Sequence, residues 1–137
     1  YDAMVIGNHE FDIIHDYKEE IFIRNINLAK FPVLGENLYK IDTTGKKIRI
    51  PNIKPYVFKI FENIRVGIIG FTTRDINDTE NIKDYNVEDA ILTARQIIPE
   101  VEENSDIIIA LTHQKYETEC PQLQAFSRRL SYCNGTT

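Results

Sequence analysis

Six consecutive residues near the start of the chain, Gly7-Asn8-His9-Glu10-Phe11-Asp12, combine side chains that can bind a metal ion with side chains that can move a proton. Asn8 offers a neutral carbonyl oxygen to a divalent cation. His9 can serve as a ligand or as a proton donor near neutral pH. Asp12 is close enough along the chain to accept a hydrogen bond from His9 and to stabilise its charged form. The string therefore suggests a metal site with acid–base chemistry beside it.

Two other residues of the string, Gly7 and Glu10, are expected to shape its backbone. Gly7 allows a sharp turn at the end of the preceding apolar run. Glu10 is expected to face elsewhere and to hold the loop in shape. Any one of these residues alone would favour a plain polar loop between a strand and a helix. The complete string directly after an apolar run favours chemistry.

A second candidate ligand is His113, which follows the apolar run of residues 106–111. A lone histidine at the end of a strand is more often a structural residue than a ligand, so its residue type alone favours a structural role. His15 lies just past the string and is interpreted as a loop residue.

The elements around these residues predict an α/β domain with helices packed against a mixed sheet. In such sheets, binding groups collect on the loops at the carboxyl ends of strands, where both Asn8-His9 and His113 are expected. Apolar runs predict strands over residues 2–6, 31–34, 56–61, 64–71 and 106–111, the third and fourth forming a hairpin around residues 62 and 63.

Two helices are predicted between these strands. The first covers residues 17–29, after a loop that runs to about residue 16. The second is strongly amphipathic from residue 87 to residue 101, with Asn86 as its N-cap and Pro99 either kinking it or ending it. Residues 72–84 are predicted to form a polar loop. After Glu119 no strand pattern is found, although Leu123, Phe126 and Leu130 could line a short helix.

Composition limits the kinds of protein that the chain can be. Its 137 residues suit one modest domain, and a net charge of −5 argues against a dedicated nucleic-acid binder. The longest apolar runs are far too short to cross a bilayer. Because the chain opens at Tyr1 inside an expected strand, we expect upstream sequence to be missing.

The string Gly7 to Asp12 resembles the signature of the calcineurin-like metallophosphoesterases, in the branch of 5'-nucleotidases, UDP-sugar hydrolases and 2',3'-cyclic nucleotide phosphodiesterases. Three further segments agree with that family in order and spacing: residues 31–37, 65–73 and 106–113. The resemblance covers residues 1–119. It implies a layered metallophosphoesterase fold of mixed β-sheets flanked by helices, incomplete here, with residues 1–119 as a partial catalytic domain and 120–137 as a divergent tail.

The resemblance also implies roles for individual residues. Asn8 and His113 would bind one of two divalent metal ions, which could be Zn, Mn, Mg or Co. His9 would be catalytic, stabilising the transition state and helping the leaving oxygen, with Asp12 keeping it oriented and protonated. A hydroxide held between the two ions would attack phosphorus.

The expected substrates are nucleotides or other phosphate esters, most simply those of a 5'-nucleotidase. A 2',3'-cyclic nucleotide phosphodiesterase, a UDP-sugar hydrolase and an apyrase remain open. The family's Asp-x-His pair, its bridging Asp and its Gly-His-x-His turn are not found, so the chain by itself is expected to be inactive. A truncated product without catalysis is the alternative of another class. The family resemblance alone favours an extracellular, periplasmic or cell-surface location, and the oligomeric state stays open.

Overall fold

The computed structural model describes residues 1–16, 18–78, 82–115 and 130–136. Its strands form three small sheets, with the orders β1-β2-β5, β10-β9-β7-β6 and β4-β3-β8. The strands are β1 (Met4–Val5), β2 (Val33–Leu34), β3 (Leu38–Ile41), β4 (Lys47–Ile48), β5 (Ile53–Lys54), β6 (Tyr56–Phe61), β7 (Ile64–Phe71), β8 (Tyr85–Val87), β9 (Ile107–Lys115) and β10 (Leu130–Thr136). The helices are α1 (Asp12–Asp16), α2 (Glu19–Leu28) and α3 (Ala90–Glu103), with the 3-10 turns η1 (His9–Phe11) and η2 (Arg74–Asp78).

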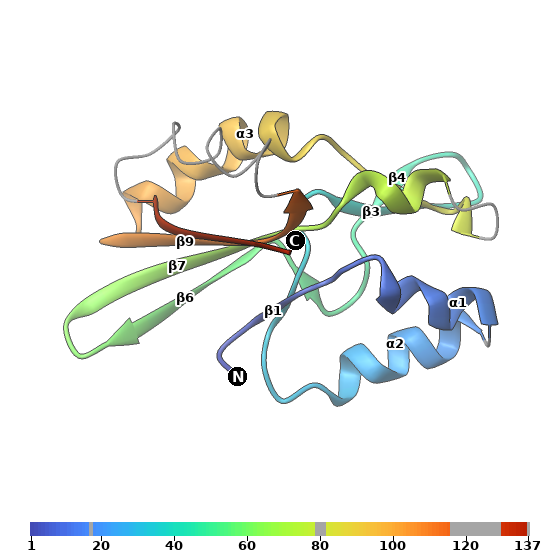
Figure 1. Cartoon of the computed structure of the whole chain (residues 1–137), viewed down its shortest axis with the longest axis horizontal. Coiled ribbons are helices and arrows are strands. Elements are labelled where there is room, and N and C mark those ends of the chain that lie inside the picture. Colours follow the sequence, from blue (N-terminus) through green and yellow to red (C-terminus); the bar gives the residue numbers. More distant parts are fainter. Residues whose placement is uncertain (17, 79–81, 116–129, 137) are drawn as a thin grey trace.

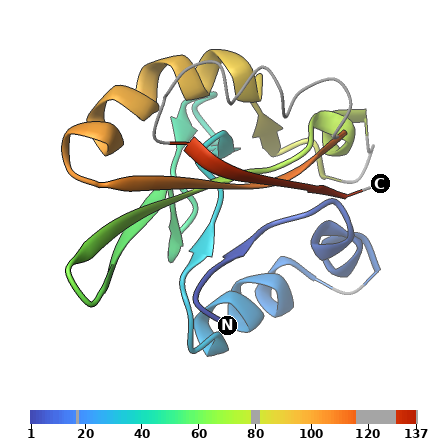
Figure 2. The ribbon, with the colours of Figure 1, turned by 60° about the vertical axis from the view of Figure 1, so that its left-hand side comes forward.

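The four-stranded sheet is the centre of the layered α/β fold. The predicted hairpin is confirmed as β6 and β7, and β7 also pairs in parallel with β9. Six of the eight residues of β7 are buried, as predicted for a strand covered on both faces. Helix α3 covers one face of this sheet, while β1 with α1 and α2 lies on the other side (Figures 1 and 2).

Two glycines of β7 allow the layers to approach one another closely. They lie three positions apart and therefore face opposite sides of the sheet. A Cβ atom on Gly67 would be 2.5 Å from Cγ1 of Val101 in α3. A Cβ atom on Gly70 would be 2.9 Å from the carbonyl carbon of Leu34 in β2 and closer still to the Leu34 side chain. The second glycine thus sets how near the β1-β2-β5 sheet lies to the central sheet.

A buried asparagine ties together the ends of several elements. Asn37, which is fully buried, donates from Nδ2 to the carbonyl oxygens of Thr72 and Glu88, each at 2.9 Å. Its Oδ1 accepts from the Thr72 backbone N–H at 2.8 Å. The amide therefore holds the segment after β2 against the ends of β7 and β8, close to the edge where the predicted site lies.

The segment after β1 was predicted to be a loop, and this prediction is wrong. η1 and α1 occupy this segment, so His15 lies in a helix. Phe11 explains the difference, because it is buried and its ring lies 5.3 Å from that of Phe22 and 5.4 Å from that of Tyr85. Burial of this aromatic ring stabilises helical turns that the polar composition obscures.

The predicted first helix is confirmed as α2, although Tyr17 lies outside the described residues. Its buried positions are Phe22 and Ile26, whereas Ile21 and Leu28, which the predicted face included, are exposed. The short strands β3, β4, β5 and β8 were not predicted. Each has two to four residues, too few to show a periodic pattern.

The second helix begins later and runs further than predicted. Asn86 is not its N-cap but lies in β8, where it pairs with Tyr39. The cap is Asp89, whose side chain accepts hydrogen bonds from the backbone N–H groups of Ile91 and Leu92. Pro99 does not end the helix, which continues to Glu103. Pro99 is exposed, so water can satisfy the carbonyl group that its missing N–H leaves without a partner.

The end of the chain also differs from the prediction. Residues Leu130–Thr136 form β10, parallel to β9 with two register shifts, where no strand was predicted. Leu130 therefore belongs to a strand, whereas Leu123, Phe126 and the predicted boundary after residue 119 lie outside the described residues. None of the helices in the described ranges is long and apolar enough to span a bilayer.

Candidate functional site

The carboxyl ends of β1 and β9 bring together the two residues predicted as metal ligands. Asn8 follows β1, and His113 lies inside β9, which extends beyond the predicted strand end. His113 Nε2 and Asn8 Oδ1 are 2.7 Å apart although 105 residues separate them in the chain. Because an amide oxygen can only accept, this bond places a proton on Nε2. Both residues are half-buried.

Gly7 is the contact point beneath this pair. It is buried, and a Cβ atom there would lie 3.0 Å from His113 Cε1 and 3.1 Å from Nδ1. The same Cβ would lie 3.0 Å from Oε2 of Glu10. A glycine is therefore needed here for the close approach of the imidazole ring as well as for the turn. The sequence suggested only the turn.

The predicted catalytic pair forms on the adjacent helical turns. His9 Nδ1 donates to Asp12 Oδ2 at 2.8 Å, and the side chains are 80% and 64% exposed. The hydrogen bond to Asp12, assisted by the Asp12 charge, raises the pKa of His9 above its usual value. This bond occupies Nδ1 and leaves Nε2 as the nitrogen that can meet a ligand.

The Asn8–His113 pair fits one divalent cation. Two ligand atoms at neighbouring corners of an octahedral site, each about 2.1 Å from the ion, lie about 3.0 Å apart. The observed 2.7 Å separation needs only a few tenths of an ångström of adjustment. An imidazole nitrogen is a common ligand for Zn and other transition metals, and a carbonyl oxygen such as that of an amide suits Mn and Mg. For His113 to bind through Nε2, its proton must leave that nitrogen.

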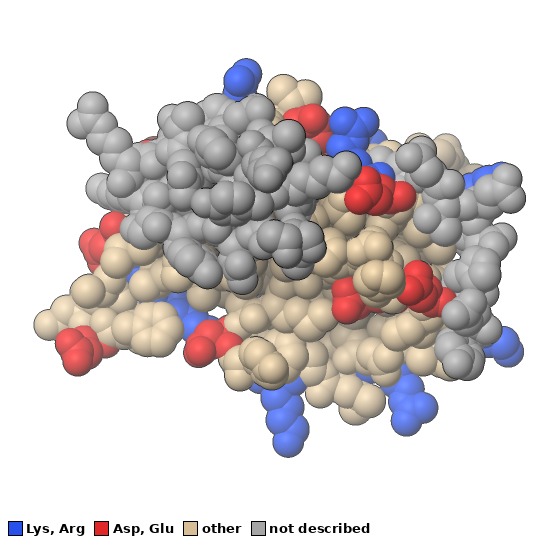
Figure 3. Space-filling model, viewed as in Figure 1, with Lys and Arg blue, Asp and Glu red and all other residues tan. Residues whose placement is uncertain are grey.

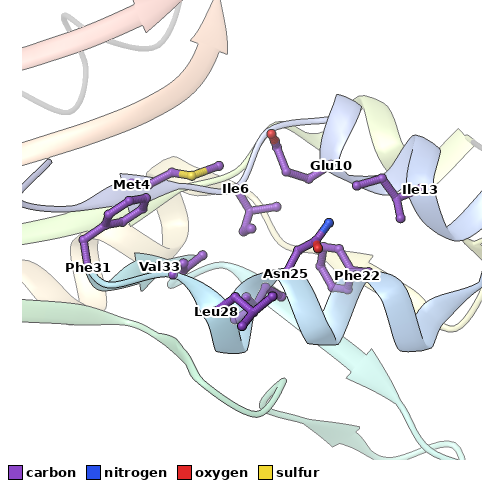
Figure 4. Close-up of a pocket in the computed structure, with 11 residues that line it drawn as sticks. Met4, Ile6, Glu10, Ile13, Phe22, Asn25, Leu28, Phe31 and Val33 are labelled. Carbon is purple, nitrogen blue, oxygen red and sulfur yellow. The ribbon is translucent and has the colours of Figure 1, made fainter.

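An open hollow of 500 Å³ lies beside His113, between β1 and β9, and includes Ala3, Val5 and Leu111 in its lining. A second hollow of 420 Å³ lies between β1 and α2, on the side of Glu10 (Figure 4). On the face shown in Figure 3, the basic side chains of the described residues stand mainly at the rim and form no broad patch.

Comparison with known proteins gives the family. The chain matches no family model. It is 35% identical to a 5'-nucleotidase of Vibrio parahaemolyticus over 118 residues, which are 82% of this chain and 20% of that protein. The chain belongs to the 5'-nucleotidase branch of the calcineurin-like metallophosphoesterases. It spans about a fifth of the length of the curated relatives it matches.

Solved structures of this family share the fold. A 5'-nucleotidase precursor from Thermus thermophilus has a TM-score of 0.71 at 26% identity, over 99% of this chain and 26% of that one. The NAD nucleotidase of Haemophilus influenzae has a TM-score of 0.76 at 23% identity, over 100% of this chain and 23% of that one. The predicted metallophosphoesterase fold is therefore confirmed.

Two contributors to the site were not found by sequence reasoning. Phe11 was given no role, although its packing fixes the turns that carry His9 and Asp12. Its only signal in the sequence is an apolar residue inside a polar string. The contact of Gly7 with His113 had no sequence signal at all, because it depends on where β9 crosses β1. Glu10 does hold the loop as predicted, by accepting a hydrogen bond from the Gly7 N–H at 2.7 Å.

Proposed function

We propose that this chain contributes to a metal-dependent phosphoric ester hydrolase, most similar to a 5'-nucleotidase, and that its substrates are nucleotides. One observation carries the proposal: the fold brings Asn8 Oδ1 to 2.7 Å from His113 Nε2, beside the exposed His9. The similarity to a curated 5'-nucleotidase supports the substrate class.

The half-buried pair has the ligand role in this proposal. Asn8 and His113 hold one of two divalent cations, and further ligands complete both coordination shells. When bound, the cations would supply positive charge beside the phosphate and lower the pKa of a bound water. Asn8 is neutral, so it contributes a ligand atom without cancelling the charge of the ion.

The exposed pair has the proton-transfer role. The Nδ1–H group of His9 donates a hydrogen bond to Asp12, which fixes the ring orientation and leaves Nε2 as the nitrogen available to the substrate. The raised pKa keeps more of His9 protonated near neutral pH. Protonated His9 can then stabilise charge on the phosphoryl group and give a proton to the leaving oxygen. Asp12 acts as the partner that keeps His9 oriented and charged.

Binding of Mn²⁺ to the 137-residue chain tests the ligand assignment. We expect isothermal titration calorimetry to detect weak binding, and the variants Asn8→Ala and His113→Ala to weaken it by at least about tenfold. His9→Ala is the matched control and should leave Mn²⁺ affinity unchanged, because His9 is not a ligand. Loss of binding in the His9 variant would mean that its role is misassigned.

A phosphate-release assay with AMP and Mn²⁺ tests the reaction. The described residues contain no group of three or more His, Cys, Asp and Glu side chains placed to hold an ion, so we expect no turnover by this chain alone. Extended to the length of the curated relatives, the protein should hydrolyse AMP, and His9→Ala should lower kcat by about 10²- to 10⁴-fold with metal content unchanged. If neither form binds Mn²⁺, the non-catalytic alternative is favoured. An extracellular, periplasmic or cell-surface location remains a prediction from the family.

A further inference from the structure

Asn8 occupies a helix-capping position without capping the helix. It is the N-cap residue of η1, with φ −70° and ψ −36°, and its side chain makes no capping hydrogen bond. An asparagine that caps a helix has an extended backbone instead of this helical one, and its side chain accepts from a backbone N–H two or three residues further on. Here its Oδ1 instead accepts from His113 Nε2 at 2.7 Å. The side chain is thus directed to the candidate site and away from the helix that it precedes.

Glu10 provides the acceptor that the backbone needs at this turn. The N–H of Ile6 donates to the Leu34 carbonyl oxygen at 3.1 Å, within the β1–β2 pairing. The next N–H, that of Gly7, therefore points away from β2. Oε2 of Glu10 accepts its hydrogen bond at 2.7 Å, and Figure 4 shows the Glu10 side chain extending back over the end of β1. Because Gly7 is buried, water is poorly placed to replace this acceptor.

The carboxylate of Glu10 and the ring of His113 both rest on Gly7. A Cβ atom at Gly7 would lie 3.0 Å from Glu10 Oε2 and 3.0 Å from His113 Cε1. Both groups therefore approach Gly7 on the side where a Cβ would stand, so a shift of the Gly7 backbone changes its contact with each of them. The hydrogen bond from Gly7 to Glu10 fixes this peptide, and Asn8 is the next residue.

From this geometry, and resting on the function proposed above, we propose that Glu10 is a positioning residue for the candidate metal ligands. By accepting the Gly7 N–H, it keeps the backbone in the conformation that directs the Asn8 side chain to His113. Without this bond, the backbone at Asn8 can relax to the extended conformation in which an asparagine side chain caps a helix. The role of Glu10 depends on the reach of its oxygen, because the acceptor must span from η1 back to β1.

Three variants separate reach from charge. Glu10→Gln keeps an oxygen at the same reach, Glu10→Asp keeps the charge but is shorter, and Glu10→Ala removes both. Glu20→Ala, on the exposed face of α2, is the matched control. In the metal-free chain we expect the NMR cross-peaks between the Asn8 side-chain amide and the His113 ring to persist with Gln and to disappear with Asp and Ala. Hydrogen exchange of the Gly7 amide should accelerate in the same two variants.

Calorimetry with Mn²⁺ gives a second readout. Glu10→Ala and Glu10→Asp should weaken Mn²⁺ binding by about tenfold, while Glu10→Gln and Glu20→Ala should bind like the unaltered chain. Persistence of the Asn8–His113 cross-peaks in the Ala and Asp variants would overturn the proposal, even if thermal stability fell, since only a structural role would then remain. If Glu10→Ala does not fold, the Asp and Gln pair decides. If the unaltered chain binds no Mn²⁺, the proposed function fails, whereas the cross-peaks still decide the role of Glu10.

Discussion

Asn8 and His9 are neighbours in the chain, yet their side chains take partners of opposite kinds. His9 bonds to Asp12 three residues away, on exposed helical turns. Asn8 bonds to His113, 105 residues away and half-buried between two strands. The first pair needs only local helical geometry, whereas the second needs the correct packing of two sheets. One short string therefore contains both a local hydrogen-bonded pair and a residue whose partner reaches it only when the chain folds.

The largest effect is expected from the residue on which both pairs depend. Phe11→Ala removes a ring that is 2% exposed and should lower the free energy of unfolding by about 3–5 kcal/mol in urea. The variant should weaken the Asn8–His113 cross-peaks and also bring the pKa of His9 back toward its usual value. The control is Phe61→Ala, at a position 49% exposed in the hairpin, where a loss of about 1 kcal/mol or less is expected. Equal losses in both variants would mean that Phe11 does not anchor the turns.

Gly70→Ala should separate the two pairs. The added methyl group meets the backbone of Leu34, so the β1-β2-β5 sheet must move away from the central sheet. Overpacking of this kind should cost about 2–3 kcal/mol and disrupt the Asn8–His113 contact, with the His9 pKa still raised. The control is Gly45→Ala, because a Cβ atom at Gly45 would meet nothing within 4 Å. Its φ of +81° strains an alanine, so the free energy of unfolding should fall by only about 1 kcal/mol. If the pKa of His9 returned to its usual value in the Gly70 variant, the His9–Asp12 hydrogen bond would depend on sheet packing and not on local geometry alone.

Glu62→Gly should change the stability of the chain without changing either pair. Glu62 has φ +56° in the turn between β6 and β7, a conformation that glycine adopts without the steric cost of a Cβ. We expect a gain of about 1 kcal/mol in the free energy of unfolding. Asn63→Gly, at the next position and without a positive φ, should give no gain. A change in the Asn8–His113 cross-peaks would contradict the independence of the hairpin from the site.

Asp12→Asn should have the smallest effect on the free energy of unfolding, because the side chains of His9 and Asp12 are both largely exposed. It should, however, clearly change the titration of His9. Losing the carboxylate should lower the pKa of His9 toward 6.5, which NMR titration of its ring protons can follow. In the unaltered chain, the raised pKa of His9 adds to the free energy of unfolding at pH values below the usual histidine pKa. This contribution is lost as the pH rises through the raised pKa. The control Asp75→Asn should not shift it. An unchanged pKa in the Asp12 variant would remove the support for the His9–Asp12 pair.

Several features could be predicted because neighbouring residues alone produce them. The hairpin of β6 and β7 follows from two β-rich runs around a two-residue turn, and α2 follows from its helix-forming residues. The hydrogen bond between His9 and Asp12 was also predicted, from their three-residue spacing alone. Misplacement of the α3 cap at Asn86 has a clear reason. β8 pairs with β3, and this non-local pairing overrides the capping preference of an asparagine.

The sequence by itself determined the family signature, the α/β class and the hydrogen bond between His9 and Asp12, since each follows from the types and order of residues along the chain. Only the tertiary structure decided that Asn8 turns to His113 and that Gly7 supports the imidazole ring. It also decided that Leu130–Thr136 pairs with β9 as a strand. The physical reason is the same in each case. These contacts arise where elements distant in the chain pack together, at a closeness that glycines such as Gly70 permit and no local pattern encodes.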